Sequence, residues 1–415
     1  MSSAETFVIV GASLAGAKAA ETLREEGFEG RIVLIGEDPE RPYERPPLSK
    51  DYLRGDAGRD AIWVHDDAGF YDQREIELRT GTLVSGLALD AREVELEGGE
   101  RIGFDKLLLA TGAVPKRLPI PGADLDGVHL LRTVADSDRL REAFGAASRL
   151  VVIGAGWIGS EVAASARQKG LDVTMLAPEQ VPLERVLGPE VGAVYRDVHA
   201  NQGVQLALGT GVESIEGDAR VQGVRTSDGR LLEADIVVVG VGVAPRTDLA
   251  EAAGLAVDNG IVVDEHLRTS APDVFAAGDV ARAAHPLFGE SIRVEHWHNA
   301  LEQGPVAARN MLGKDVPYDR VPYFFSDQYD VGMEYAGHAT EWDRVVFRGD
   351  PGTLEFMVFW MRGDRVAAGM NVNVWDVTDH VQALVRSGTP VEDAALADPD
   401  VPLTDLAPNS TQEDS

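Results

Sequence analysis

The chain contains no cysteine. It therefore has no disulfide bond, no thiolate nucleophile and no iron–sulfur cluster held by its own thiolates. A function that relays electrons through a protein dithiol, as in thiol-disulfide reductases, is excluded for the same reason. Any redox chemistry of this chain must come from a bound cofactor.

The sequence also lacks long apolar runs. No window approaches the ~18 continuous apolar residues that a membrane-spanning helix needs. The opening stretch MSSAETFVIVGAS lacks the basic region and the apolar core of a signal peptide. Together these absences predict a soluble, cytoplasmic protein.

Basic residues are few, because 38 lysines and arginines stand against 69 aspartates and glutamates, a formal net charge of −31. This charge repels polyanions and argues against non-specific binding to nucleic acid or to an anionic membrane. The 44% of apolar residues and the 44 glycines indicate a globular protein with many tight turns. The length of 415 residues suggests two or three domains at roughly 150 residues each. We predict no metal site.

Two stretches of the chain share one order of elements. Thr6–Val10 is an apolar run that ends at a glycine, and it is followed by the helical pattern LAGAKAAETLREEG and a second apolar run, RIVLIGE. The same order recurs from Arg149 to Ala177, in RLVVIGAGWIGSEVAASARQKGLDVTMLA. Each stretch predicts a nucleotide-binding strand–helix–strand unit, so two bound nucleotides are implied.

Further apolar runs indicate the rest of the architecture. Lys106–Gly112, Asp235–Gly242 and Asp273–Asp279 are typical of buried strands that end on glycine. From about Val321, short apolar runs alternate with Gly and Asp turns, which predicts an antiparallel sheet. We therefore predict an α/β protein with two Rossmann-like nucleotide-binding domains and a C-terminal α+β domain. The polar, acidic ending DPDVPLTDLAPNSTQEDS predicts a loose tail.

The first glycine motif runs from Gly11 to Gly16, as GASLAG. Its first glycine permits a tight turn, its last lets the helix pack on the strand, and the N–H groups at the helix start attract a pyrophosphate. Ser13 replaces the usual middle glycine and brings a Cβ toward the phosphate. Glu37 follows the second strand, where it can accept hydrogen bonds from ribose hydroxyls.

The second glycine motif, Gly154 to Gly159, is the complete GAGWIG. It lies between a predicted strand and a predicted helix, as pyrophosphate binding requires. Glu161 comes two positions later, and we expect it in the first turn of that helix, where an anion gains from the helix dipole.

The stretch MLAPEQ follows the second strand of this unit, where an acidic side chain usually binds the adenine ribose of NADH. Ala177 occupies that position and cannot bind a 2′-hydroxyl, although Glu179 lies within reach. No Lys or Arg lies between Leu171 and Leu183 to hold a 2′-phosphate. NADH is therefore favoured, and NADPH stays possible.

Five motifs, RPPLSK, LLLATGA, GAGWIGSEVA, VFAAGDVA and FFSDQYD, occur in this order along the chain. As a set they resemble the oxygenase-coupled, NADH-dependent ferredoxin reductases over about residues 5 to 390. Members of that family share the fold of glutathione reductase. The resemblance implies an FAD-binding domain formed by residues 1–112 and 244–320, an inserted NAD(P)H-binding domain at 113–243, a C-terminal domain at 321–400 and a flexible acidic tail at 401–415.

The resemblance and the glycine motifs together give the candidate cofactor-binding residues. Those expected to hold FAD are Gly11, Ser13, Leu14, Ala15, Gly16, Glu37, Arg45, Lys50, Val84, Thr111, Gly112, Arg132, Asp279 and Trp297. Those expected to hold NADH are Gly154, Gly156, Trp157, Ile158, Gly159, Glu161, Glu179 and Gly242.

The resemblance also implies a catalytic pair. Lys50 is expected near the flavin N5, paired with Glu161, because a cation there stabilises an anionic reduced flavin. Without the resemblance, the proline-rich loop that carries Arg45 and Lys50 is equally well interpreted as solvated, and Trp297 as a core aromatic. The chain departs from the family at Arg246, where relatives often carry Asn, and at Tyr323 and Phe325, where relatives commonly carry Trp.

The implied function is an FAD-dependent NADH:ferredoxin oxidoreductase. Electrons enter as a hydride from NADH and leave singly to a small iron–sulfur ferredoxin, which serves a cytochrome P450 or a Rieske oxygenase. We expect transient docking, with Arg282 and Arg293 as a local basic surface for an acidic ferredoxin, and a monomer or weak homodimer. Two alternatives stay open: a flavin reductase of a small molecule, such as monodehydroascorbate or dioxygen, and an NADH-sensing protein of the apoptosis-inducing-factor type.

Overall fold

The computed structural model describes residues 5–407, and the chain divides into two compact units. The first unit contains the chain up to Arg45, then Gly58–Val114 and Val243–Arg320. The second contains Pro46–Ala57, Pro115–Gly242 and the chain from Val321 on. The twelve-residue stretch Pro46–Ala57 thus belongs to the second unit, although both of its flanks belong to the first.

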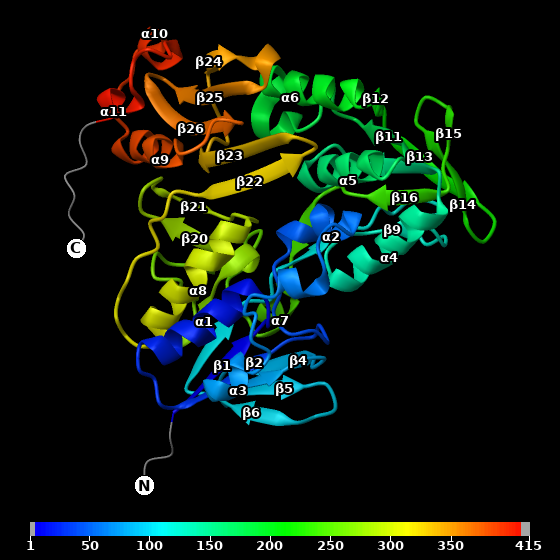
Figure 1. Ribbon diagram of the computed structural model, residues 1–415. Coiled ribbons are helices and arrows are strands. Elements are labelled where there is room, and N and C mark those ends of the chain that lie inside the picture. Colours follow the sequence, from blue (N-terminus) through cyan, green and yellow to red (C-terminus); the bar gives the residue numbers. More distant parts are fainter. Residues whose placement is uncertain (1–4, 408–415) are drawn as a thin grey trace. The chain divides into compact units, whose positions relative to one another are not determined.

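The first unit is built on a parallel five-stranded sheet in the order β19-β7-β1-β2-β3, of which β1 and β2 are labelled in Figure 1. These strands are β1 (Thr6–Val10), β2 (Arg31–Ile35), β3 (Ile76–Arg79), β7 (Lys106–Leu109) and β19 (Val274–Ala276). Their central residues are buried, as expected for parallel strands covered on both faces. Helices α1 (Leu14–Glu25) and α8 (Trp297–Met311) pack together, and Gly304 lets their backbones approach closely, since a Cβ there would lie 2.4 Å from the Ala15 carbonyl oxygen.

Smaller elements complete the first unit. They are α3 (Phe70–Gln73), α7 (Asp248–Ala252), the sheet of β4 (Val84–Ala88), β5 (Glu93–Leu96) and β6 (Arg101–Gly103), the sheet of β18 (Ile261–Val263), β20 (Ala281–His285) and β21 (Glu290–Ile292), and the 3₁₀ turns η2 (Arg59–Ile62) and η3 (Gly278–Val280). Short strands β8 (Ala113–Pro115) and β17 (Val243–Pro245) lie where the chain leaves and re-enters this unit.

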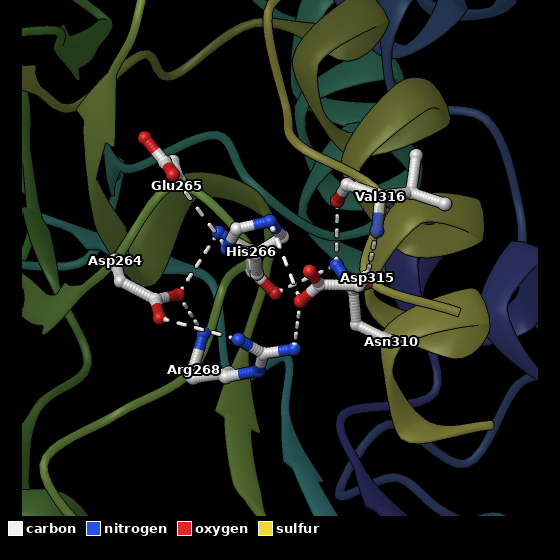
Figure 2. A network of polar contacts seen from close by, with 7 residues as sticks. All are labelled: Asp264, Glu265, His266, Arg268, Asn310, Asp315 and Val316. Atoms are coloured by element: carbon white, nitrogen blue, oxygen red, sulfur yellow. Dashed lines mark hydrogen bonds and ion pairs between the residues drawn. The ribbon is translucent and has the colours of Figure 1, made fainter. Parts of the chain in front are cut away.

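A polar network fixes the end of α8 in the first unit (Figure 2). Arg268 pairs with Asp315 at 2.6 Å, and the Nδ2 of Asn310 donates to the His266 carbonyl oxygen at 2.8 Å. The backbone N–H of Val316 donates back to the Asn310 side chain at 2.7 Å. The network is satisfied within the protein, and it orients the helix that begins with Trp297.

The second unit contains another parallel sheet, in the order β12-β11-β10-β16-β9. Its strands and helices are β9 (Val128–His129), α4 (Val134–Ala146), β10 (Arg149–Ile153), α5 (Trp157–Gln168), β11 (Asp172–Ala177), α6 (Glu184–Asn201), β12 (Gln205–Leu208) and β16 (Ile236–Val239). An antiparallel sheet of β13 (Val212–Gly217), β14 (Val221–Thr226) and β15 (Leu231–Glu233) joins them, and Pro46–Ala57 adds η1 (Pro46–Ser49) and α2 (Asp51–Arg54).

The C-terminal part of the second unit is an antiparallel sheet in the order β22-β23-β26-β25-β24. Its elements are β22 (Tyr323–Gln328), β23 (Val331–Gly337), β24 (Arg344–Asp350), η4 (Pro351–Thr353), β25 (Glu355–Arg362), β26 (Arg365–Val372), α9 (Thr378–Ser387), α10 (Asp393–Ala397) and α11 (Leu403–Leu406). The predicted fold class is confirmed: two Rossmann-like parallel sheets and a C-terminal antiparallel sheet. Helix α11 forms inside the segment predicted as a tail, with Leu403 buried, and the part of that tail from residue 408 on lies outside the described residues.

Helix α6 and the C-terminal sheet share one apolar core. Leu187 and Tyr195 of α6 pack with Phe324 of β22 and Trp360 of β25. Gly188, with a φ of +81°, interrupts α6, and the Leu187 carbonyl oxygen accepts a hydrogen bond from the Trp360 indole N–H at 3.1 Å. Helix α6, which lies between β11 and β12 along the chain, therefore connects the parallel sheet of the second unit to the C-terminal sheet.

Candidate functional site

In the first unit, the glycine turn between β1 and α1 is shaped by backbone packing. Gly11 has a φ of +121°, and a Cβ on it would lie 2.0 Å from the Ala110 carbonyl oxygen. A Cβ on Gly16 would lie 2.0 Å from the Gly11 carbonyl oxygen. Helix α1 starts at Leu14, after a short turn that follows β1, with Ser13 at its N-cap and no acidic residue in its first turn. Its unpaired N–H groups fit an anionic pyrophosphate.

Three of the predicted FAD residues come together around Arg246. Glu37, just after β2, forms a 2.6 Å ion pair with the Arg246 guanidinium. The Thr111 hydroxyl donates to the Arg246 carbonyl oxygen at 2.8 Å, and the Arg246 N–H donates to the Gly112 carbonyl oxygen at 2.9 Å. Arg246, which departs from the family pattern, is thus a partner of the carboxylate predicted to bind ribose.

Trp297 is the first residue of α8 and is partly buried. Its indole N–H donates to the Glu44 carboxylate. Burial raises the pKa of Glu44, while the Trp297 hydrogen bond and the positive charge of Lys18 act in the opposite direction. Sequence reasoning missed Glu44, although it stands beside Arg45 in the proline-rich motif.

The other FAD candidates of the first unit lie at strand ends and in turns. Val84 is buried at the start of β4, and the Arg45 guanidinium lies 5.4 Å from the centre of the Tyr43 ring. Asp279 lies in η3, directly after β19, and its carbonyl oxygen accepts from Arg293 at 3.2 Å. Leu14 and Ala15 are buried in the first turn of α1.

In the second unit, the glycines of the turn between β10 and α5 have different surroundings: some are packed against backbone atoms, and one faces open space. A Cβ on Gly159 would lie 2.1 Å from the Gly154 carbonyl oxygen, and one on Gly154 would lie 2.4 Å from the Gly240 carbonyl oxygen. Gly156 is exposed, and no atom lies within 4 Å of the position of its Cβ. Gly242 is equally open, with a φ of +97°. Packing therefore explains two of these glycines, whereas Gly156 and Gly242 leave space for a ligand.

The side chains that follow Gly156 divide between core and surface. Trp157 packs edge-on against Phe324, with ring centres 5.0 Å apart, and against Tyr195. Ile158 is exposed. The indole of Trp157 is thus partly committed to the protein core, while Ile158 is available to a dinucleotide.

The end of β11 carries an ion pair that sequence reasoning missed. Ala177 is buried, and Glu179 pairs with the Arg185 guanidinium at 2.5 Å. Arg185 lies two residues after Leu183, in the first turn of α6. The chain turns there, so that the Arg185 side chain lies beside Glu179. The lack of a cation between Leu171 and Leu183 therefore argues less strongly against NADPH than the linear sequence suggests.

Lys50 and Glu161 form an ion pair of 2.8 Å, as the resemblance implied. Both side chains are buried, and the Ser49 hydroxyl donates to the same carboxylate oxygen, Oε2, at 2.5 Å. The expectation that Glu161 lies in the first turn is wrong, because α5 begins at Trp157 and Glu161 is one turn further on. The carboxylate is held by direct donors rather than by the helix terminus.

A residue that sequence reasoning did not select also contacts this pair. The hydroxyl of Ser326, from β22, donates to Oε1 of Glu161 at 2.7 Å. Phe325 precedes it, and its ring centre lies 5.8 Å from the Lys50 ammonium. Burial raises the pKa of Asp327; Lys50 lowers it and Glu161 raises it further. The FFSDQ motif could have drawn attention to this part of the chain. The motif alone does not show which of its side chains faces Glu161, because that depends on how β22 pairs with its neighbour.

Two further predictions concern arginines. Arg132 precedes α4 in the second unit, and its backbone N–H donates to the Asp136 carboxylate at 3.1 Å. In the first unit, Arg282 pairs with Asp258 at 2.7 Å and Arg293 with Glu295 at 2.5 Å. The two arginines proposed for ferredoxin docking are thus neutralised by neighbouring carboxylates.

Within residues 5–407, no helix combines the length and apolar character needed to span a membrane. The same residues contain no group of three or more His, Asp or Glu side chains placed to hold a metal ion.

Comparison with known proteins assigns the family. Residues 5–304 match the pyridine nucleotide-disulphide oxidoreductase model, and residues 323–407 match the reductase C-terminal model. Rhodocoxin reductase from Rhodococcus erythropolis is 41% identical over 403 residues, which cover 96% of this chain and 93% of that protein. The ferredoxin–NAD(+) reductase component of the anthranilate 1,2-dioxygenase system from Burkholderia cepacia is 41% identical over 405 residues, covering 97% and 99%.

A solved structure shows the same architecture. The covalent putidaredoxin reductase–putidaredoxin complex contains a chain that matches with a TM-score of 0.93 and 39% identity, covering 97% of this chain and 98% of that chain. Although it contains no cysteine, the chain belongs to the pyridine nucleotide-disulphide oxidoreductase family and, by its reductase C-terminal domain and its relatives, to the oxygenase-coupled ferredoxin reductases.

Proposed function

We propose that the chain is an FAD-dependent NADH:ferredoxin reductase, which passes electrons from NADH through FAD, one at a time, to a small iron–sulfur ferredoxin. That ferredoxin serves a cytochrome P450 or a Rieske oxygenase; among the similar proteins, one reductase is named for a dioxygenase system and another for the CYP199A2 system. One observation carries the proposal: each unit contains its own glycine turn at a helix N-terminus, in a chain that has no thiol. Two nucleotides and no dithiol leave flavin as the redox centre.

The residues fit these cofactors. The turn from Gly11 to Gly16 would hold the FAD pyrophosphate and Glu37 its ribose, with the remaining FAD candidates around them. The turn from Gly154 to Gly159 would hold the NADH pyrophosphate, where the open position at Gly156 allows close backbone approach. The division into an FAD-binding domain, an NADH-binding insert and a C-terminal domain stays part of this proposal.

Bound FAD supplies the ability to accept a hydride and to release electrons singly. The protein's part is to bind, to orient and to set the charge near the reacting ring. We assign that charge to Lys50, kept as a compact cation by its 2.8 Å contact with Glu161. Because the pair is buried, its electrostatic effect is weakened little by salt.

Docking of the ferredoxin is proposed to be transient. Fast turnover suits a small interface, of at most about 1,200 Å² of buried surface. We also propose that the chain is a monomer or weak homodimer, located in the cytoplasm.

Stopped-flow reduction of the FAD-loaded protein with NADH and with NADPH, followed by titration with an iron–sulfur ferredoxin, tests the function. We expect faster reduction by NADH and rapid cytochrome c reduction only when ferredoxin is added. A protein that stays colourless after incubation with excess FAD contradicts the proposal. Fast reduction of a small molecule without ferredoxin indicates a small-molecule reductase, and slow reduction with a long-lived charge-transfer band indicates an NADH-sensing protein.

A further inference from the structure

The Glu161 carboxylate is a buried anion held from two separate parts of the chain. Its Oε2 accepts from Lys50 at 2.8 Å and from Ser49 at 2.5 Å, both in the short stretch Pro46–Ala57. Its Oε1 accepts from Ser326 at 2.7 Å, in the reductase C-terminal domain. Each oxygen thus has its own donors, and Ser326 alone contacts Oε1 among the hydrogen bonds described for residues 5–407.

Ser326 reaches the carboxylate because of the alternation along β22. Ser326 and Gln328 are both 1% exposed, whereas Asp327 between them faces solvent. The Gln328 amide N–H lies 3.5 Å from the Ser326 hydroxyl oxygen, at the limit of a hydrogen bond. The amide is oriented to donate to the hydroxyl, and the hydroxyl donates to the carboxylate. Donors that all point toward one anion reinforce each other in a buried site.

Two further polar side chains lie next to Gln328: His199 on α6 and Tyr329, which directly follows β22. His199 is fully buried, and its Nδ1 lies 3.0 Å from the Tyr329 hydroxyl. Gln328 lies beside His199 and favours its protonated form, but burial dominates and lowers the pKa of His199 to about 4. The ring is therefore neutral near pH 7 and adds no positive charge beside Gln328.

We infer that Ser326 is a positioning residue for the Lys50–Glu161 pair: it fixes one carboxylate oxygen, so that the other stays aimed at the Lys50 ammonium. The inference rests on the proposed function, in which Lys50 acts near the reacting ring. It assigns the C-terminal domain a part in hydride transfer, through Glu161, besides any part in docking. Without the Ser326 hydroxyl, the carboxylate can rotate about its last bond and the ammonium loses a fixed partner.

Ser165 offers a matched control. It is also a buried serine of the second unit, and its hydroxyl donates at 2.7 Å to the Ser49 carbonyl oxygen instead of to Glu161. Ser165→Ala therefore removes one buried hydrogen bond of equal length close to the pair, without removing a donor of the carboxylate. Ser326→Cys fills almost the same space as serine but donates a much weaker hydrogen bond, and so separates a lost donor from a lost volume.

The first measurement is single-turnover reduction of the FAD-loaded variants at saturating NADH. We expect the limiting rate to fall about 10-fold in Ser326→Ala and by a comparable factor in Ser326→Cys, since hydrogen bonds to charged groups are the stronger ones. Ser165→Ala should stay within about twofold of the parent, because its hydrogen bond does not reach the carboxylate. Equal rates in Ser326→Ala and Ser165→Ala overturn the inference, as does a parent-like rate in Ser326→Cys.

The second measurement is independent of turnover. The chain has only six lysines, so nitrogen-15 NMR of their ammonium groups gives few signals, and Lys50→Met assigns the one from Lys50. We expect a Lys50 signal protected from exchange with water in the parent and in Ser165→Ala, and lost to exchange in Ser326→Ala. A Lys50 signal equally protected in all three proteins contradicts the inference, whatever the rates.

Two further variants separate this inference from the proposed function. If Lys50→Met slows reduction and Ser326→Ala does not, the positioning role alone is wrong. If Lys50→Met and Glu161→Gln both reduce at the parent rate with FAD still bound, the proposed role of the pair itself is wrong.

Discussion

His199 illustrates how burial changes the chemistry of a single residue. The side chain has no exposed surface, and its pKa is lowered to about 4 by burial. An unfolded chain protonates the same ring near pH 6.5. Between these two pKa values, His199 is protonated in the unfolded state but not in the folded state. The folded state therefore loses stability as the pH falls from about 6.5 to about 4.

We expect the free energy of unfolding to fall by about 2 kcal/mol between about pH 7 and pH 5 through His199 alone. Urea unfolding of the parent and of His199→Phe at both pH values isolates this contribution, because other titrating groups act in both proteins. The variant should show the smaller loss. Equal losses in the two proteins would mean that His199 is protonated as easily in the folded state as in the unfolded one.

The ion pair of Glu179 and Arg185 affects the choice between NADH and NADPH. Their 2.5 Å ion pair places a guanidinium next to the carboxylate proposed to bind the NADH ribose. In Glu179→Gln the repulsion between carboxylate and 2′-phosphate is removed and Arg185 is released. We expect the Kd of NADPH to fall about 10-fold relative to that of NADH.

Fluorescence titration with both nucleotides measures this change in Kd. The control adds Arg185→Ala to Glu179→Gln, and this second substitution should abolish the gain in NADPH affinity. If the gain persists without Arg185, another group binds the 2′-phosphate.

At the scale of elements, the turn between β10 and α5 contains glycines with different tasks. A side chain on Gly159 would collide with the Gly154 carbonyl oxygen at 2.1 Å, whereas one on Gly156 meets open space. Gly159→Ala should therefore reduce thermal stability or the yield of folded protein. Gly156→Ala should fold normally and bind NADH about 10-fold more weakly, because its methyl group occupies the approach to the pyrophosphate.

Differential scanning calorimetry of the FAD-loaded variants, followed by NADH titration, distinguishes the two glycines. Normal NADH affinity in Gly156→Ala would show that the dinucleotide does not approach the turn at this residue.

The strands of both parallel sheets could be predicted because their residues are apolar over the whole strand. Thr6–Val10 and Arg149–Ile153 are such runs, and the structure has strands there. The start of α5 could not be placed as well, because Glu161 in the first turn requires a helix that begins after Trp157, whereas Gly156 forms the N-cap and α5 begins at Trp157. The expected position of Glu161 was wrong by that shift.

The contacts of the candidate site were harder to predict than its residues. Ser326 lies 165 residues from Glu161 along the chain, and no periodicity within β22 indicates which helix it will meet. Arg185 was missed for a different reason: the chain turns back after Val181, so that a residue six positions after Glu179 becomes its neighbour in space.

At the scale of the whole molecule, charge dominates the encounter with a partner. The formal net charge is −31, and the two arginines proposed for docking are paired with carboxylates. An acidic ferredoxin is therefore repelled at long range. We expect its association rate constant to rise when the ionic strength increases from about 10 mM to about 150 mM, because the Debye length shrinks from about 30 Å to about 8 Å.

Stopped-flow mixing of the reduced protein with oxidised ferredoxin measures that rate. Reduction by NADH, recorded in the same buffers, separates docking from the preceding step. A rate that falls with added salt would instead reveal an attractive basic surface that lies outside Arg282 and Arg293.

Helix α6, which connects the parallel sheet of the second unit to the C-terminal sheet, restricts how such reductases can be recombined. Leu187 on α6 and Trp360 on β25 are joined by a hydrogen bond and a common core, and Glu161 and Ser326 are joined by a hydrogen bond. A chimera whose crossover lies between residues 202 and 322 takes each partner of these two pairs from a different parent. Exchange of the C-terminal domain to change ferredoxin preference should succeed only between parents that agree at all four positions.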